Sequence, residues 1–64
     1  MKRTALLRHL RKQGCRLARE GAKHSLYFNP AQKRYSTIPR HAEIDDKLAK
    51  KICRDLGAPE IGKS

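Results

Sequence analysis

The strongest pattern in this 64-residue chain is an aliphatic residue at every fourth position, namely Ile44, Leu48, Ile52 and Leu56. Such spacing predicts an amphipathic helix whose apolar face must be buried against other elements. Gly57 fits the end of this helix, because glycine readily adopts the left-handed conformation of a C-terminal cap. A chain of this length buries only about 60% of its unfolded surface, so it has room for one domain with one thin core.

The first two thirds of the chain predict a shorter helix and three strands. Thr4 is the expected N-cap of a helix that carries Leu6 and Leu10 on one face and ends at Gly14. Short turns separate the expected strands, which span residues 15–20, 23–29 and 35–38. Short turns favour an antiparallel meander, and the simplest packing places both helices on one face of that sheet. We therefore expect a single α+β domain, α-β-β-β-α, over residues 1–64, with an ordered core at 3–57 and a tail at 58–64.

The positive charge is concentrated in residues 1–40. This segment holds eleven of the sixteen Lys and Arg residues and one acidic residue, Glu20, whereas residues 41–64 are balanced. The net charge of +10 at pH 7 attracts polyanions and speeds their association. Contact with nucleic acid is therefore the main interpretation, and a basic surface that only neutralises ribosomal RNA is the alternative.

Other classes of site are not indicated by the sequence. Cys15 and Cys53 have neither Cys-x-x-Cys nor zinc-finger spacing, so we expect two buried thiols in a reducing cytoplasm, with a disulfide as the alternative. No cluster of acidic residues suggests a metal site, and no cofactor is expected. The basic start of the chain lacks the apolar run of a signal peptide or membrane span, so a cytoplasmic protein without membrane contact is expected.

Several short motifs follow one another between Leu7 and Leu56. They are Gly14-Cys15, Gly21-Ala22-Lys23-His24-Ser25-Leu26-Tyr27, Asn29-Pro30, Thr37-Ile38-Pro39-Arg40-His41 and Glu43-Ile44-Asp45. In this order, and in a chain of this length and charge, they resemble the HicA family, the RNA-cleaving toxins of HicA–HicB toxin–antitoxin pairs. The family pattern has one small residue between its glycine and histidine, whereas Ala22 and Lys23 both intervene here.

The resemblance implies a double-stranded-RNA-binding-like fold and endoribonuclease activity on mRNA, which inhibits translation and growth. It also implies a HicB-like antitoxin that covers the active site in a hetero-oligomer, while the chain alone is expected to be a monomer or weak dimer. A non-catalytic module that binds double-stranded RNA or the ribosome is the alternative function.

His24 is the residue to which the resemblance assigns catalysis. Histidine exchanges protons near neutral pH, so neutral His24 would remove the proton of a ribose 2′-OH. The oxygen would then attack the adjacent phosphate and leave a 2′,3′-cyclic end. Lys23, Arg19 and Arg40 are the cations expected to bind RNA phosphate nearby. The resemblance implies an endoribonuclease with a single catalytic histidine, and the lack of an acidic cluster favours a metal-independent reaction.

The alternative for His24 is a histidine at a strand end that is hydrogen-bonded to the backbone. Strand alternation places it on the same side as Leu26 and Phe28. If those two side chains face the helices, His24 lies at the rim of the core.

Two further histidines and two tyrosines are candidates for the site. His41 precedes the last helix and is interpreted as an accessory acid or base, or as an exposed or capping group of that helix. His9 is expected to be solvated. Tyr27 and Tyr35 either stack on RNA bases or pack against neighbouring strands.

The last helix carries three lysines that are expected to contact RNA phosphate, Lys47, Lys50 and Lys51. Double-stranded-RNA-binding domains use lysines in this way and read the shape of the RNA. The alternative is a solvated helix face with Glu43–Lys47 and Asp46–Lys50 ion pairs at four-residue spacing.

Overall fold

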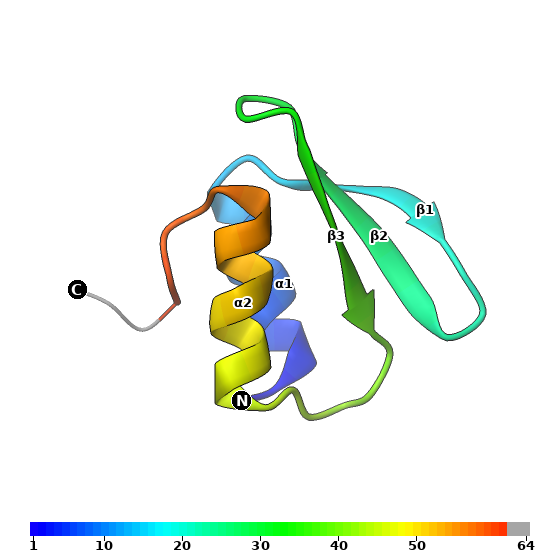
Figure 1. The fold of residues 1–64 in the computed structure, drawn as a ribbon. Helices are drawn as coiled ribbons and strands as arrows, with labels where there is room; N and C mark the ends of the chain where they lie inside the picture. Colours follow the sequence, from blue (N-terminus) through cyan, green and yellow to red (C-terminus); the bar gives the residue numbers. More distant parts are fainter. Residues whose placement is uncertain (62–64) are drawn as a thin grey trace.

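The computed structural model describes residues 1–61, which form two helices and a three-stranded antiparallel sheet (Figure 1). Along the chain the elements are α1 (Arg3–Lys12), β1 (Arg16–Glu20), β2 (His24–Asn29), β3 (Arg34–Pro39) and α2 (Asp46–Leu56). The strands lie in the order β1-β2-β3, and both helices lie on one side of the sheet. The expected α-β-β-β-α fold is confirmed. Of the expected tail, residues 62–64 lie outside the described residues.

The two helices begin in different ways. Asp45 caps α2, since its side chain accepts a hydrogen bond from the Lys47 backbone N–H, and Gly57 ends it with a left-handed φ of 69°. The expectation that Thr4 caps the first helix is wrong, because Thr4 lies inside α1. The N-terminal N–H of α1 is satisfied by a distant backbone group instead, since Arg3 N donates to Ala42 O at 2.9 Å.

The strands differ from expectation at their ends. Cys15 precedes β1 and is buried in the core, whereas every residue of β1 is exposed. β1 is an edge strand that extends beyond the cover of the helices in Figure 1. Ala18 interrupts its register with β2 as a bulge. Pro39, expected to follow the third strand, is its last residue, a position at which the missing N–H of proline is tolerated on an edge strand.

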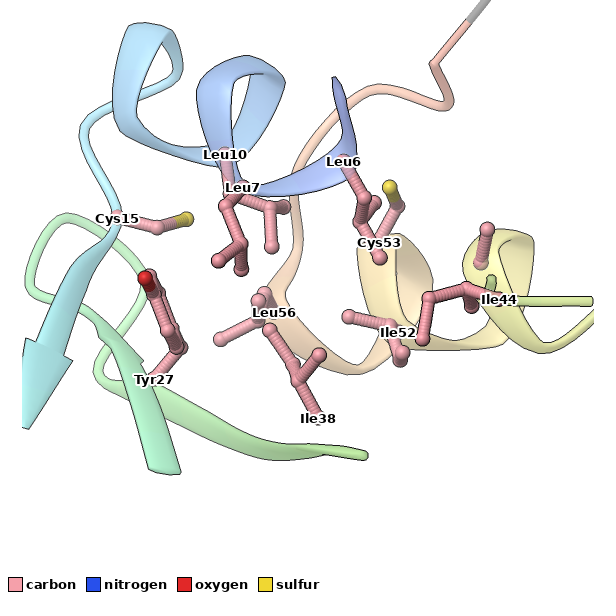
Figure 2. Packing of buried hydrophobic residues seen from close by; sticks show 11 residues of the cluster. Leu6, Leu7, Leu10, Cys15, Tyr27, Ile38, Ile44, Ile52, Cys53 and Leu56 are labelled. Carbon is pink, nitrogen blue, oxygen red and sulfur yellow. The ribbon is translucent and has the colours of Figure 1, made fainter. Parts of the chain in front are cut away.

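The core lies between the helices and the covered face of the sheet (Figure 2). Its largest fully buried aliphatic side chains are at most 2% exposed and come from four segments of the chain: Leu6, Leu10, Ile38, Ile44, Ile52 and Leu56. Tyr27 is 3% exposed and points into the same cluster. The helical stripe that dominates the sequence therefore packs against β2 and β3, and α1 closes the core from the side.

Strand β2 has one buried and one open side. Ser25, Tyr27 and Asn29 are buried beneath the helices, so alternation turns His24, Leu26 and Phe28 the other way. We call this second side of the sheet the open face. Leu26 and Phe28 therefore do not face the helices. His24 lies exposed at one end of the open face rather than at the rim of the core.

Candidate nucleic-acid cleavage site

His24 is the first residue of β2, immediately after the tight turn from β1. The turn is closed by a hydrogen bond from Gly21 N to His24 O at 2.8 Å. A Cβ on residue 21 would lie only 2.8 Å from that same oxygen, so the close approach requires glycine. The backbone of His24 is thereby held in place while its exposed imidazole remains accessible.

A shallow pocket of about 420 Å³ lies beside this turn. Its lining residues are Lys23, His24, Arg40 and His41. Lys23 and His24 come from the β1–β2 turn, and Arg40 and His41 come from the segment after β3. The chain therefore combines two permanent cations with two imidazoles in one accessible site, which suits a phosphate group and proton transfer beside it.

Arg40 links the two segments that form the pocket. Its backbone N–H donates to Lys23 O at 3.3 Å, and its Nη1 donates to Gly21 O at 3.3 Å. The same Nη1 lies 3.6 Å from the Glu20 carboxylate. Both side chains are about half exposed, so solvent weakens this ion pair. Arg40 nevertheless holds the turn before His24 against the end of β3.

A second set of hydrogen bonds supports the site from the helix-covered side. Arg3, on α1, donates from Nε to Pro39 O at 2.8 Å and from Nη2 to Ser25 Oγ at 2.7 Å. Ser25 Oγ in turn donates to Glu20 Oε1 at 2.5 Å. Helix α1 is thus connected to the ends of all three strands next to His24. The sequence analysis assigned no role to Arg3 or to Ser25, although Ser25 lies in the motif around His24, and Glu20 stood out only as the single acid of residues 1–40.

The other expected cations are not gathered at the pocket. Arg19 is exposed on β1 and pairs in register with Leu26, which places it on the open face. Lys47, Lys50 and Lys51 lie on α2, on the opposite side of the sheet from His24. They share no site with His24, although each is exposed.

The acidic residues at the start of α2 pair with the start of the chain. The carboxylates of Glu43 and Asp46 lie 3.6 and 3.3 Å from the terminal ammonium of Met1. Within residues 1–61 the Glu43–Lys47 and Asp46–Lys50 pairs, given above as the alternative to phosphate contact, are not formed. The intrahelical pair at four-residue spacing is Lys51–Asp55, at 3.0 Å.

The other two histidines and the two tyrosines lie in different surroundings. His41 is exposed and lines the pocket, and capping of α2 by His41 is wrong because Asp45 does this. His9 is half-buried with its Nε2 2.7 Å from Pro59 O, so it is not simply solvated. Tyr27 packs in the core, whereas Tyr35 is 56% exposed on the open face.

The two cysteines lie away from this chemistry. Cys15 and Cys53 are free thiols and both are buried. Burial raises the pKa of each thiol, with the charge of the other cysteine adding to the effect at Cys15. Protonated, buried thiols are poor nucleophiles, so they act as small core side chains.

The sequence was compared with models of known protein families. A family model described as "HicA toxin of bacterial toxin-antitoxin" matches residues 4–58, most of the chain. The chain belongs to the HicA toxin family. No match was found among curated proteins or among solved structures.

HicA toxins are mRNA-cleaving toxins of bacterial toxin–antitoxin systems. Membership therefore makes RNA the target and an antitoxin the partner of this HicA toxin. Among residues 1–61, none of the helices is long and apolar enough to cross a bilayer. The pocket beside His24, which lies within the matched region, is the candidate site for RNA cleavage.

Proposed function

We propose that this HicA toxin cleaves mRNA in the cytoplasm at the pocket beside His24, without a metal ion. The observation that carries the proposal is the pocket itself, in which His24 lies with Lys23, Arg40 and His41. The resemblance to the family's Gly…His motif supports the choice of His24 among the three histidines of the chain.

His24 is the general base of the proposed reaction. Its neutral imidazole takes the proton of a ribose 2′-OH, and the 2′-oxygen attacks the adjacent phosphorus. The bond from phosphorus to the 5′-oxygen breaks, which leaves a 2′,3′-cyclic phosphate on one product and a 5′-OH on the other. Lys23 and Arg40 stabilise the negative charge that grows on the phosphate oxygens.

His41 is the proposed accessory group for the second half of this reaction. The departing 5′-oxygen needs a proton, and a protonated imidazole on the same pocket wall is a suitable donor. His24 alone suffices for the base step, with water protonating the leaving oxygen. A smaller loss for His41→Ala than for His24→Ala is therefore expected.

The remaining proposed RNA contacts lie outside the pocket. Arg19 extends the positive charge onto the open face, and Lys47, Lys50 and Lys51 present charge on α2. If each contacts a phosphate, its removal lowers affinity for all RNA sequences and reduces the salt dependence of binding by about one ion per residue.

The central experiment compares cleavage of a synthetic RNA by the purified wild-type chain and by His24→Gln, with His9→Gln as the matched control outside the pocket. General-base catalysis is worth about 10²- to 10⁴-fold, and a loss of this size is expected for His24→Gln alone. The wild-type products should carry cyclic phosphate ends, and EDTA should leave the rate unchanged. Wild-type cleavage by His24→Gln would overturn the proposal. RNA binding without cleavage by the wild-type chain would favour the non-catalytic module.

We also propose that a HicB-like antitoxin covers the pocket in a hetero-oligomer, and that the toxin alone is a monomer or weak dimer. Its net charge of +10 favours a partner of opposite charge, which associates quickly and loses affinity as salt rises. Light scattering after gel filtration tests the oligomeric state. Charge reversal by Lys23→Glu should weaken antitoxin binding, whereas reversal of Lys12, exposed at the end of α1, should not.

A further inference from the structure

The open face of the sheet joins the pocket but takes no part in the reaction described above. Beyond His24, the side chains of the three strands that share it are Arg16, Arg19, Leu26, Phe28, Tyr35, Thr37 and Pro39. The register pairs Leu26 with Thr37 and Phe28 with Tyr35, and paired residues of antiparallel strands point to the same face. None of the helices covers this side in Figure 1.

An exposed aromatic pair dominates the far end of the open face. The rings of Phe28 and Tyr35 have centroids 4.6 Å apart and are tilted by 30°. Phe28 is half-buried, and Tyr35 is 56% exposed. The inner ring thus supports the outer one, and Tyr35 presents a large surface to solvent. An exposed aromatic surface of this kind is available for a base to stack on.

Positive charge borders the aromatic pair. Arg16 lies opposite Phe28 and Arg19 lies opposite Leu26, both on the exposed strand β1. Aromatic rings beside arginines on an open sheet suit single-stranded nucleic acid, because bases stack on the rings while the cations contact phosphates. A stacked base needs no particular sequence, since every base has a π-face.

The aromatic pair and His24 are aligned along one strand. His24 and Phe28 are four residues apart on the same side of β2, a separation of about 13 Å along the strand. A short extended segment of RNA can therefore reach from the pocket to Tyr35. The helix lysines lie on the other side of the molecule and cannot contact the same short segment.

We propose that the open face is a subsite for single-stranded RNA, in which a base a few nucleotides from the cleaved bond stacks on Tyr35. Phe28 supports the Tyr35 ring, and Arg16 and Arg19 contact the backbone of the same segment. This inference rests on the proposed cleavage at His24 for its position along the RNA, but the binding itself is independent of cleavage.

The first test measures binding of a short single-stranded RNA by fluorescence anisotropy with the full chain in a His24→Gln background. Adding Tyr35→Ala should weaken binding about 5- to 100-fold, because one stacked base is lost. Tyr35→Trp and Tyr35→Phe should keep the affinity, and Tyr35→Thr, which retains β propensity, should lose it. Leu17→Ala is the matched control, since Leu17 is 49% exposed on β1 but pairs with Tyr27 and so points to the other face.

A second test places an abasic nucleotide at each position of the RNA in turn. One position should weaken binding to the parent chain as much as Tyr35→Ala does, and should cause no further loss in Tyr35→Ala. Unchanged RNA affinity of Tyr35→Ala would overturn the proposal. So would a loss of antitoxin binding with RNA binding intact, which would make the open face a protein-docking surface. If the wild-type chain, with His24 intact, does not cleave RNA but Tyr35→Ala still weakens RNA binding, the proposed function is contradicted and this subsite stands.

Discussion

The two sides of strand β2 differ sharply in how far their side chains are exposed. On the covered side Ser25, Tyr27 and Asn29 are at most 3% exposed. On the open face His24 is exposed, while Leu26 and Phe28 are half-buried. One six-residue strand thus separates stability from the proposed RNA contact by alternation alone. Adjacent substitutions should therefore change different measurements, and four predictions test this.

The largest difference is expected between Tyr27 and Phe28. Removal of a buried aromatic ring costs about 3–5 kcal/mol, so Tyr27→Ala should leave this small domain largely unfolded. Phe28→Ala loses mainly the ring pair with Tyr35 and should cost about 1 kcal/mol. Urea unfolding followed by circular dichroism measures both. Equal losses of stability would show that the open face also belongs to the core.

The next largest effect is expected at Asn29, which joins the sheet to the end of α2. Its buried Nδ2 donates to Leu56 O at 2.6 Å, and its Oδ1 accepts from Ala31 N at 3.2 Å. Asn29→Ala should lower the free energy of unfolding by about 1–3 kcal/mol, because it leaves Leu56 O buried without this donor. Asn29→Asp is the sharper variant, since it keeps the acceptor and removes the donor. Unchanged stability of both variants would contradict this role.

A smaller effect is expected at Ser25, the covered neighbour of His24. Ser25→Ala removes the link between Arg3 and Glu20 and should cost about 1 kcal/mol. The same change should lower the cleavage rate more than the RNA affinity, because the link supports the turn that holds His24. The effect on rate is measured as kcat of Ser25→Ala against the wild type. The effect on affinity is measured as RNA binding by the same two chains after His24→Gln is added to each. Loss of affinity alone would place Ser25 with the binding surface instead.

The smallest effect concerns the two buried thiols of the core, Cys15 and Cys53. Burial raises the pKa of Cys15 and Cys53 above their ordinary value of 9.0. Above that pH the unfolded chain therefore releases thiol protons that the folded chain retains, and stability falls as pH rises through the folded pKa. Urea midpoints between pH 7 and 10 should fall more steeply for the wild type than for Cys15→Ala/Cys53→Ala. The same dependence of the urea midpoint on pH in both chains would contradict this prediction.

Local patterns predicted most of the secondary structure. The aliphatic stripe and Gly57 predicted α2, and turn residues separated the three strands close to their observed bounds. The N-terminus of α1 was not predictable from Thr4, because the group that satisfies it is Ala42 O, thirty-nine positions from Arg3 in the chain.

The candidate site was predicted only in part. The resemblance pointed to His24, and charge pointed to Lys23 and Arg40, which lie in the same pocket. Capping by His41 was excluded only by the position of Asp45, which caps α2 itself. Arg3 and Ser25 carried no pattern of their own, since their partners come from other elements.

The sequence by itself determined the elements, their order, the excess of positive charge in residues 1–40 and the motifs of the HicA family. These depend on the spacing and chemistry of residues close together in the chain. Only the tertiary structure decided which side of β2 faces the helices, and therefore that Tyr27 is core, Tyr35 is exposed and His24 opens onto a basic pocket. A strand's alternation defines two sides equally well, and packing against α1 and α2 selects between them.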